Sequence, residues 1–185
     1  MRTSETHPLY VDFIPLENWN ITGRIGLTFT PGKCHPSIKG NWKRDLEKDI
    51  ERLKNYWYTD FLVSLIEEHE FHYLQIPTLL DSVKEKGIEV IWFPIQDQSI
   101  PALMTDFHKV VAKINDLVKS GRTVVVHCMG GLGRTGLVVA GCLVSLLNIS
   151  PEEAVILTRK VREGAIQTSE QKEYIFLYYE YLISL

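Results

Sequence analysis

The 185-residue sequence has few cysteines, and their spacing excludes two kinds of small stabilised fold. Only Cys34, Cys128 and Cys142 are present, an odd number without a Cys-x-x-Cys pair. A disulfide framework needs an even number of cysteines, and a structural zinc site needs ligands grouped in pairs. We therefore expect free thiols and a reducing, cytoplasmic location.

The sequence also lacks a long apolar run and a large excess of one charge. Its longest apolar stretch, residues 136–147, is too short to span a bilayer, which takes about 20 residues. The N-terminal residues lack the apolar core of a signal peptide. The net charge of −3 argues against a general nucleic-acid binder. We expect neither a membrane nor a nucleic acid as partner, and the sequence does not fix an oligomeric state.

Hydrophobic periodicity and turn residues divide the chain into alternating strands and helices. This alternation predicts a three-layer α/β/α domain with a central, mostly parallel sheet flanked by helices. We expect an N-terminal arm over 1–20 and a single domain over 21–185. The expected strands are 21–30, 61–66, 88–93 and 122–128, and the expected helices are 42–55, 77–86, 99–119 (capped by Ser99), 135–147, 150–162 (with a Ser150–Glu153 capping box) and 168–182.

One stretch, His127-Cys128-Met129-Gly130-Gly131-Leu132-Gly133-Arg134-Thr135, has the residue types of a phosphate site. It follows a valine-rich strand and opens a helix, so glycine N–H groups and the helix N-terminus converge on one point. Arg134 supplies a planar fork for two phosphate oxygens. Such surroundings favour a thiolate, which makes Cys128 a candidate nucleophile. A buried cysteine before a glycine-rich turn would explain the glycines but not the spacing to the arginine.

This loop resembles the active-site loop of the cysteine-dependent protein phosphatases, H-C-x-x-G-x-x-R-[ST], with Gly131 and Thr135 at the family positions. The chain is similar to the dual-specificity branch of that superfamily, and within it to the kinase-associated phosphatases. Segments 26–32, 76–81, 94–97 and 164–168 extend the similarity over most of residues 24–180. The resemblance implies a phosphatase that needs no metal or other cofactor and forms a phosphocysteine on Cys128.

Roles follow from the resemblance, residue by residue. The backbone amides of Met129, Gly130, Gly131, Leu132 and Gly133, with Arg134, would hold the phosphoryl oxygens. Thr135 would assist departure of the sulfur, and His127 would orient the cysteine. By chemistry alone, Thr135 is equally an ordinary hydroxyl at a helix start and His127 a satisfied core histidine.

The general acid and the residue that positions water lie outside the loop. Asp97 follows an expected strand at the aspartate position of the family's acid loop, and Asp106 is the alternative. Gln167 matches the glutamine that positions the hydrolytic water, with Gln171 second and also a candidate for substrate binding. Without the resemblance, Asp97 could equally cap a turn or helix.

Met129 and Leu132 occupy the variable loop positions where phosphoinositide phosphatases of this superfamily tend to carry basic residues. We therefore expect a phosphorylated protein or peptide as substrate, with phosphotyrosine and also phosphoserine or phosphothreonine cleaved, and a protein kinase among the candidate partners. A phosphopeptide-binding module with weak turnover and a phosphatase for a non-protein phosphoester such as a phosphoinositide remain the alternatives. The run 35–40 looks inserted relative to the kinase-associated phosphatases.

Overall fold

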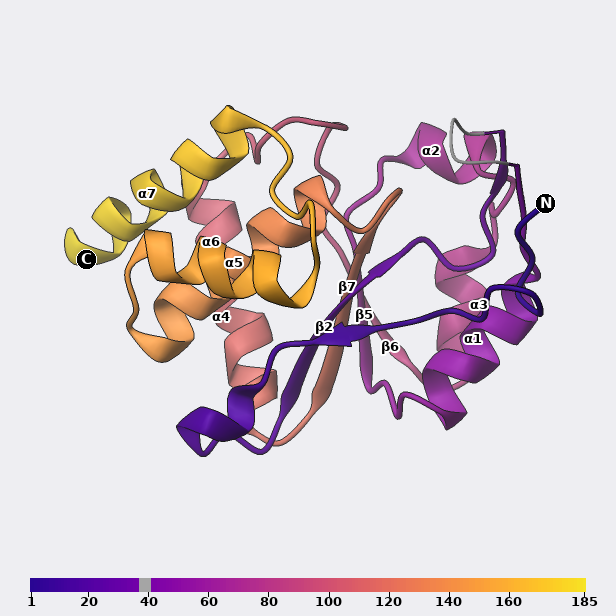
Figure 1. The fold of residues 1–185 in the computed structure, drawn as a ribbon, viewed down its shortest axis with the longest axis horizontal. Helices are drawn as coiled ribbons and strands as arrows, with labels where there is room; N and C mark the ends of the chain where they lie inside the picture. The colour runs from indigo at the N-terminus through magenta and orange to yellow at the C-terminus, as the bar shows by residue number, and fades with distance from the viewer. Residues whose placement is uncertain (37–40) are drawn as a thin grey trace.

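The central element of the fold is a five-stranded sheet with the order β1-β2-β7-β5-β6, seen nearly edge-on in Figure 1. A computed structural model describes residues 1–36 and 41–185, so most of the run that looks inserted lies outside the described residues. The strands β2, β7, β5 and β6 are parallel, and the short edge strand β1 is antiparallel to β2. The strands are β1 (Asp12–Phe13), β2 (Arg24–Phe29), β5 (Phe61–Ser64), β6 (Glu89–Trp92) and β7 (Thr123–Cys128).

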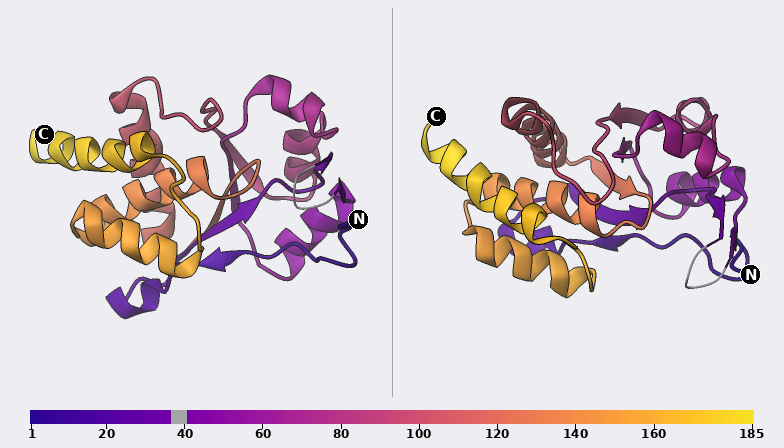
Figure 2. Two further views of the ribbon diagram at one scale, coloured as in Figure 1. Left: turned by 45° about the horizontal axis from the view of Figure 1, so that its top comes forward. Right: turned by 90° about the horizontal axis from the view of Figure 1, so that it is seen from above.

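Helices cover both faces of the sheet, which confirms the predicted layered α/β architecture. Figures 1 and 2 show α1 and α3 on one side and α4 to α7 on the other. The helices are α1 (Leu46–Asn55), α2 (Glu68–Tyr73), α3 (Leu79–Glu85), α4 (Met104–Lys119), α5 (Gly133–Leu147), α6 (Pro151–Val161) and α7 (Ser169–Ile183). Within the described residues, no helix combines the length and the apolar character needed to cross a membrane.

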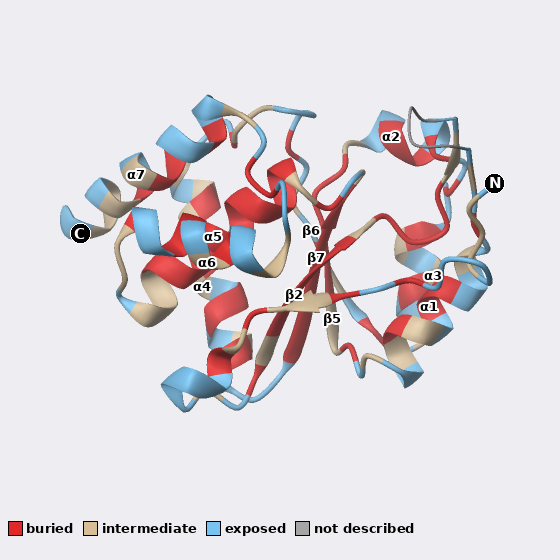
Figure 3. Cartoon of the chain, viewed as in Figure 1, coloured by how far each residue is buried: buried red, intermediate tan, exposed pale blue. Residues whose placement is uncertain are grey.

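The core is continuous from the sheet to α5. All six residues of β7 are buried, as expected of a central parallel strand rich in valine. Twelve residues of α5 are buried as well, and Figure 3 shows this burial on both elements. Residues 1–20 contribute Leu9, Val11, Ile14 and Leu16 to the same core, so this segment packs closely on the domain.

Two expectations about the helices need correction, and one helix is unexpected. The helix α4 begins at Met104 rather than at Ser99. Pro101 explains the difference, because the residue before a proline avoids helical dihedrals and proline itself lacks an N–H donor. The helix α1 begins at Leu46, where Asp45 accepts a hydrogen bond from the Lys48 amide, and residues Trp42–Lys43 instead form a strand, β4, paired with β3 (Cys34–His35). The six-residue helix α2 was not expected.

Candidate active site

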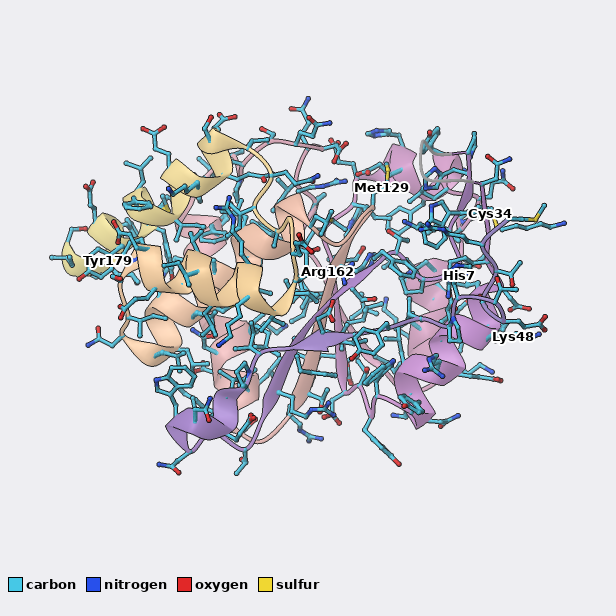
Figure 4. All side chains as sticks on the ribbon, viewed as in Figure 1. His7, Cys34, Lys48, Met129, Arg162 and Tyr179 are labelled. Carbon is cyan, nitrogen blue, oxygen red and sulfur yellow. The ribbon has the colours of Figure 1, made fainter. Side chains whose placement is uncertain are left out.

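The loop from Met129 to Leu132 joins the carboxyl end of the central strand β7 to the first turn of α5. Figure 4 labels Met129 on this loop and Arg162, which follows α6. Gly131 has φ +68°, and a Cβ there would lie 2.2 Å from the Thr28 carbonyl oxygen of β2. A Cβ at Gly133 would lie 2.8 Å from the Gln167 side-chain oxygen. The backbone contact and the positive φ therefore require glycine at position 131, whereas at position 133 a side chain would have to displace the end of the Gln167 side chain.

Arg134 lies in the first turn of α5 and is almost fully buried. Its two terminal nitrogens donate to the two carboxylate oxygens of Glu70 at 2.6 and 2.9 Å. One of them also donates to the Ile95 carbonyl at 2.9 Å. Burial alone would lower the Arg134 pKa, but the Glu70 carboxylate and the nearby Cys128 charge outweigh it and raise that pKa. The guanidinium is therefore a fixed cation beside the phosphate loop.

The segment that carries Asp97 is tied to the same arginine. The Asp97 carboxylate lies 2.9 Å from an Arg134 terminal nitrogen, and its side chain is 52% exposed. The amides of Phe93 and Ile95 bond to carbonyls at the end of β5, which fixes the start of the segment. The structure thus brings Asp97 to the loop, whereas Asp106 lies on α4 and pairs with Lys109 at 3.0 Å.

Glu70 is a residue of this site that the sequence analysis missed. It lies on α2, is 2% exposed, and forms a capping box with Glu67 at the start of that helix. A signal was present, since several glutamates follow β5 at the carboxyl edge of the sheet. A helix of six residues has too little periodicity to be recognised, so their position next to Arg134 could not be inferred.

His127 and Thr135 flank the loop inside the protein, each with no exposed surface. Burial lowers the pKa of His127 to about 3, and the charges of Arg134 and Lys33 act in the same direction. The imidazole is therefore neutral at physiological pH. The Thr135 hydroxyl has no hydrogen-bond partner within the described parts of the chain, which leaves it free to bond a group at the loop.

The side chains of Gln167 and Gln171, near the N-terminus of α7, make different contacts. Gln171 is buried. Its side-chain oxygen accepts a hydrogen bond from the backbone N–H of Gln167 at 3.0 Å, and its side-chain nitrogen donates to the Ser99 carbonyl at 3.1 Å. It therefore links α7 to the segment that carries Asp97. Gln167 instead lines a cavity of about 930 Å³ beside the loop, together with Met129 and Leu132.

We expect the buried His127 to contribute to acid sensitivity. The unfolded chain binds a proton on this ring below about pH 6.5, but the folded protein does so only near pH 3, so stability falls as the pH drops through that window. Between about pH 7 and about pH 4.5 the loss from this group is about 2–3 kcal/mol. Chemical denaturation at both pH values measures the free energy of unfolding, and the decrease in it between the two pH values should be smaller in His127→Gln than in wild type. Equal losses would show that another group is responsible.

Comparison with known proteins shows which family the chain resembles in sequence. A sequence model of the cyclin-dependent kinase inhibitor 3 family matches residues 2–155. The chain is 33% identical to cyclin-dependent kinase inhibitor 3 of Mus musculus and 32% identical to that of Homo sapiens, in each case over 174 residues, 92% of this chain and 79% of the relative.

Solved structures agree with the sequence relatives. A crystal structure of kinase associated phosphatase, with its catalytic-site cysteine replaced by serine, has a TM-score of 0.86 and 29% identity, and the alignment covers 96% of this chain and 98% of that chain. Tk-PTP in its active form has a TM-score of 0.72 at 28% identity, with 92% and 96% covered. The chain therefore belongs to the cyclin-dependent kinase inhibitor 3 family, within the dual-specificity branch of the cysteine-dependent phosphatases, and is an enzyme of that class.

Proposed function

We propose that this phosphatase hydrolyses phosphotyrosine, and also phosphoserine and phosphothreonine, through a phosphocysteine on Cys128. One observation carries the proposal: Arg134 of the phosphate loop bonds to the segment that carries Asp97 through Ile95 and through Asp97 itself. A nucleophile, a phosphate-binding cation and a carboxyl acid are therefore adjacent, as transfer of a phosphoryl group to sulfur requires.

In the first step the Cys128 sulfur attacks phosphorus as the ester P–O bond breaks. The Arg134 guanidinium and the loop amides neutralise the three phosphoryl oxygens. Asp97 donates its proton to the leaving oxygen, so the side chain of the substrate departs as a neutral phenol or alcohol and the Asp97 carboxylate remains. The 52% exposure of the Asp97 side chain is compatible with contact to the leaving group of a bound substrate.

In the second step a water attacks the phosphocysteine and the P–S bond breaks. We assign Gln167, which lines the cavity beside the loop, to hold this water, while Asp97 takes its proton. Thr135 donates a hydrogen bond to the departing thiolate. His127 is buried and neutral, so it does not transfer protons, and we assign it the role of orienting Cys128, its neighbour at the end of β7. The side-chain amide of Gln171 is already bonded to Ser99 and Gln167, so we assign it to holding these two segments together and not to positioning the water.

A phosphoprotein is the substrate class that the surroundings favour. Met129 and Leu132 present apolar side chains at the variable loop positions. Lys33 and Arg162 line the same cavity, but both already bond loop carbonyls, so they offer little to a second phosphate of an inositol ring. The names of the relatives link them to cyclin-dependent kinases, so a phosphorylated kinase is a candidate partner for this chain, and we propose a cytoplasmic location. A matched set of phosphotyrosine, phosphoserine and phosphothreonine peptides would rank the three substrates.

The first test is release of p-nitrophenol from p-nitrophenyl phosphate, under reducing conditions with a chelator present. We expect turnover that a chelator does not change, because no step above uses a metal. Folded wild type that binds a phosphopeptide without turnover would instead establish a binding module. Turnover of a phosphoinositide but of no phosphopeptide would overturn the substrate class.

Replacing Asp97 by asparagine should lower kcat by about 10²–10⁴-fold, since the amide cannot donate the proton. The fall should be larger with a phosphotyrosine peptide than with p-nitrophenyl phosphate, whose leaving oxygen needs less protonation. Asp106→Asn is the matched control, because Asp106 pairs with Lys109 on α4. Loss of turnover in the control but not in Asp97→Asn would identify Asp106 as the acid.

A further inference from the structure

Each carbonyl oxygen of the phosphate loop accepts a hydrogen bond from outside the loop. The donors come from two segments of the chain, residues 30–33 and 162–166, and two of the donors are cationic side chains. The pairs are Thr30 Oγ1 to Cys128 O at 2.9 Å, Lys33 Nζ to Met129 O at 3.0 Å, Arg162 Nη2 to Gly130 O at 3.2 Å, Arg162 Nε to Gly131 O at 2.6 Å, and Ile166 N to Leu132 O at 3.2 Å.

These bonds fix where the loop amides point. In a trans peptide the carbonyl of one residue and the N–H of the next point in opposite directions across a rigid plane. When Lys33 and Arg162 hold the carbonyls of Met129, Gly130 and Gly131, the next three N–H groups are turned the other way. Those N–H groups belong to Gly130, Gly131 and Leu132, the centre of the loop that would surround a phosphate.

Arg162 is itself held by the N-terminal segment. It follows α6, and its Nη1 lies 2.5 Å from a carboxylate oxygen of Asp12 on β1. The guanidinium thus joins three parts of the chain: the arm, the end of α6 and the phosphate loop. The ion pair fixes the plane of the guanidinium, so that Nε and Nη2 face two successive carbonyls.

Lys33 is almost fully buried, at 4% exposure, although lysine rarely is. Its ammonium lies 4.8 Å from the centre of the Phe29 ring and 4.4 Å from that of Trp42. Burial lowers its pKa to about 8, while the nearby Cys128 charge acts against that change. A buried charge is costly unless it is hydrogen-bonded, and the Met129 carbonyl is the acceptor that Lys33 has among the described residues.

We propose that Lys33 and Arg162 are positioning residues that hold the phosphate loop with its amides directed at the bound anion, and that Asp12 extends this control to the N-terminal segment. The proposal rests on the proposed function and adds a part to it. Without the two cations, a peptide plane of this glycine-rich loop can turn over, and its carbonyl oxygen then repels the phosphate.

The test uses Lys33→Met and Arg162→Met, with tungstate as an unreactive phosphate mimic. The inhibition constant of tungstate against p-nitrophenyl phosphate should rise by about 10- to 100-fold in each variant, since Lys33→Met loses one charged hydrogen bond to the loop and Arg162→Met loses two. Arg162→Lys, which keeps a cation able to reach one carbonyl, should recover part of the affinity. A purely structural role would give no such recovery.

Arg52→Met is the matched control, because the Arg52 Nε also donates to a backbone carbonyl, but to that of Leu9 in the arm, at 2.7 Å, and not to the phosphate loop. Its tungstate affinity should equal that of wild type. Asp12→Asn leaves both bonds from Arg162 to the loop in place. It should weaken tungstate binding two- to several-fold, roughly the effect of losing a partly exposed ion pair. This variant tests the proposal if a methionine variant does not fold. Wild-type affinity in folded Lys33→Met, Arg162→Met and Asp12→Asn would overturn the inference, whereas a wild type without turnover or tungstate binding would overturn the proposed function.

Discussion

Cys128→Ser should abolish turnover of p-nitrophenyl phosphate, by roughly 10⁴-fold or more, while the protein stays folded and still binds tungstate. A serine hydroxyl is not ionised near neutral pH and attacks phosphorus poorly, whereas the loop amides and Arg134 do not depend on the sulfur. Cys128 is 3% exposed at the end of β7, and serine is close to it in size, so the core is preserved. Steady-state p-nitrophenol release and tungstate binding by calorimetry separate these two effects.

The chain offers a matched control for this substitution. Cys142 lies on α5 with no exposed surface, and burial raises the pKa of its thiol, so it stays protonated and inert. Cys142→Ser should therefore keep turnover within a few-fold of wild type. Iodoacetate should inactivate wild type and Cys142→Ser at similar rates. Turnover that survives Cys128→Ser would remove the phosphocysteine mechanism.

The sequence predicts the parts of the site that are local. The loop from Cys128 to Arg134 was recognised because the nucleophile, the glycines and the arginine are close along the chain and lie between a strand and a helix. The order of strands and helices followed from alternating periodicity, which depends on each segment alone. Asp97 was assigned from the resemblance, and the structure brings its carboxylate to Arg134, although its catalytic role stays a prediction.

The parts that were missed depend on contacts between distant segments. Lys33 meets Met129 across 96 positions of the chain, and Arg162 meets Asp12 across 150, so no local pattern marks either pair. The short helix α2 gave no periodic signal, and Glu70 was missed with it. Serine is a common N-cap, so a helix was expected to begin at Ser99. Pro101, two residues later, disfavours helical dihedrals before it, and the helix begins at Met104 instead.

Glu70→Gln should damage both stability and turnover, because Glu70 is the buried carboxylate that holds both terminal nitrogens of Arg134. The glutamine has nearly the same shape but no charge, and it leaves a buried guanidinium without a full partner. Loss of one member of a buried ion pair costs about 3–5 kcal/mol of unfolding free energy. We also expect kcat/KM to fall by about 10²–10³-fold, because the guanidinium turns away from the position of the phosphoryl oxygens.

Asp49→Asn separates the two effects of Glu70→Gln. Arg44 and Asp49 form a second buried, two-bond ion pair, at 2.7 and 2.8 Å, outside the phosphate loop. Asp49 also accepts a hydrogen bond from the Gly32 amide at 2.8 Å, a bond that an asparagine oxygen can still accept. Removing its charge should cost a similar free energy of unfolding in urea while kcat/KM changes by only a few-fold. If both variants lose stability and activity in equal proportion, Glu70 serves the fold alone. If Glu70→Gln loses activity far beyond its matched control, Glu70 positions Arg134 for catalysis, and the acidic helix after β5 is a working part of the active site.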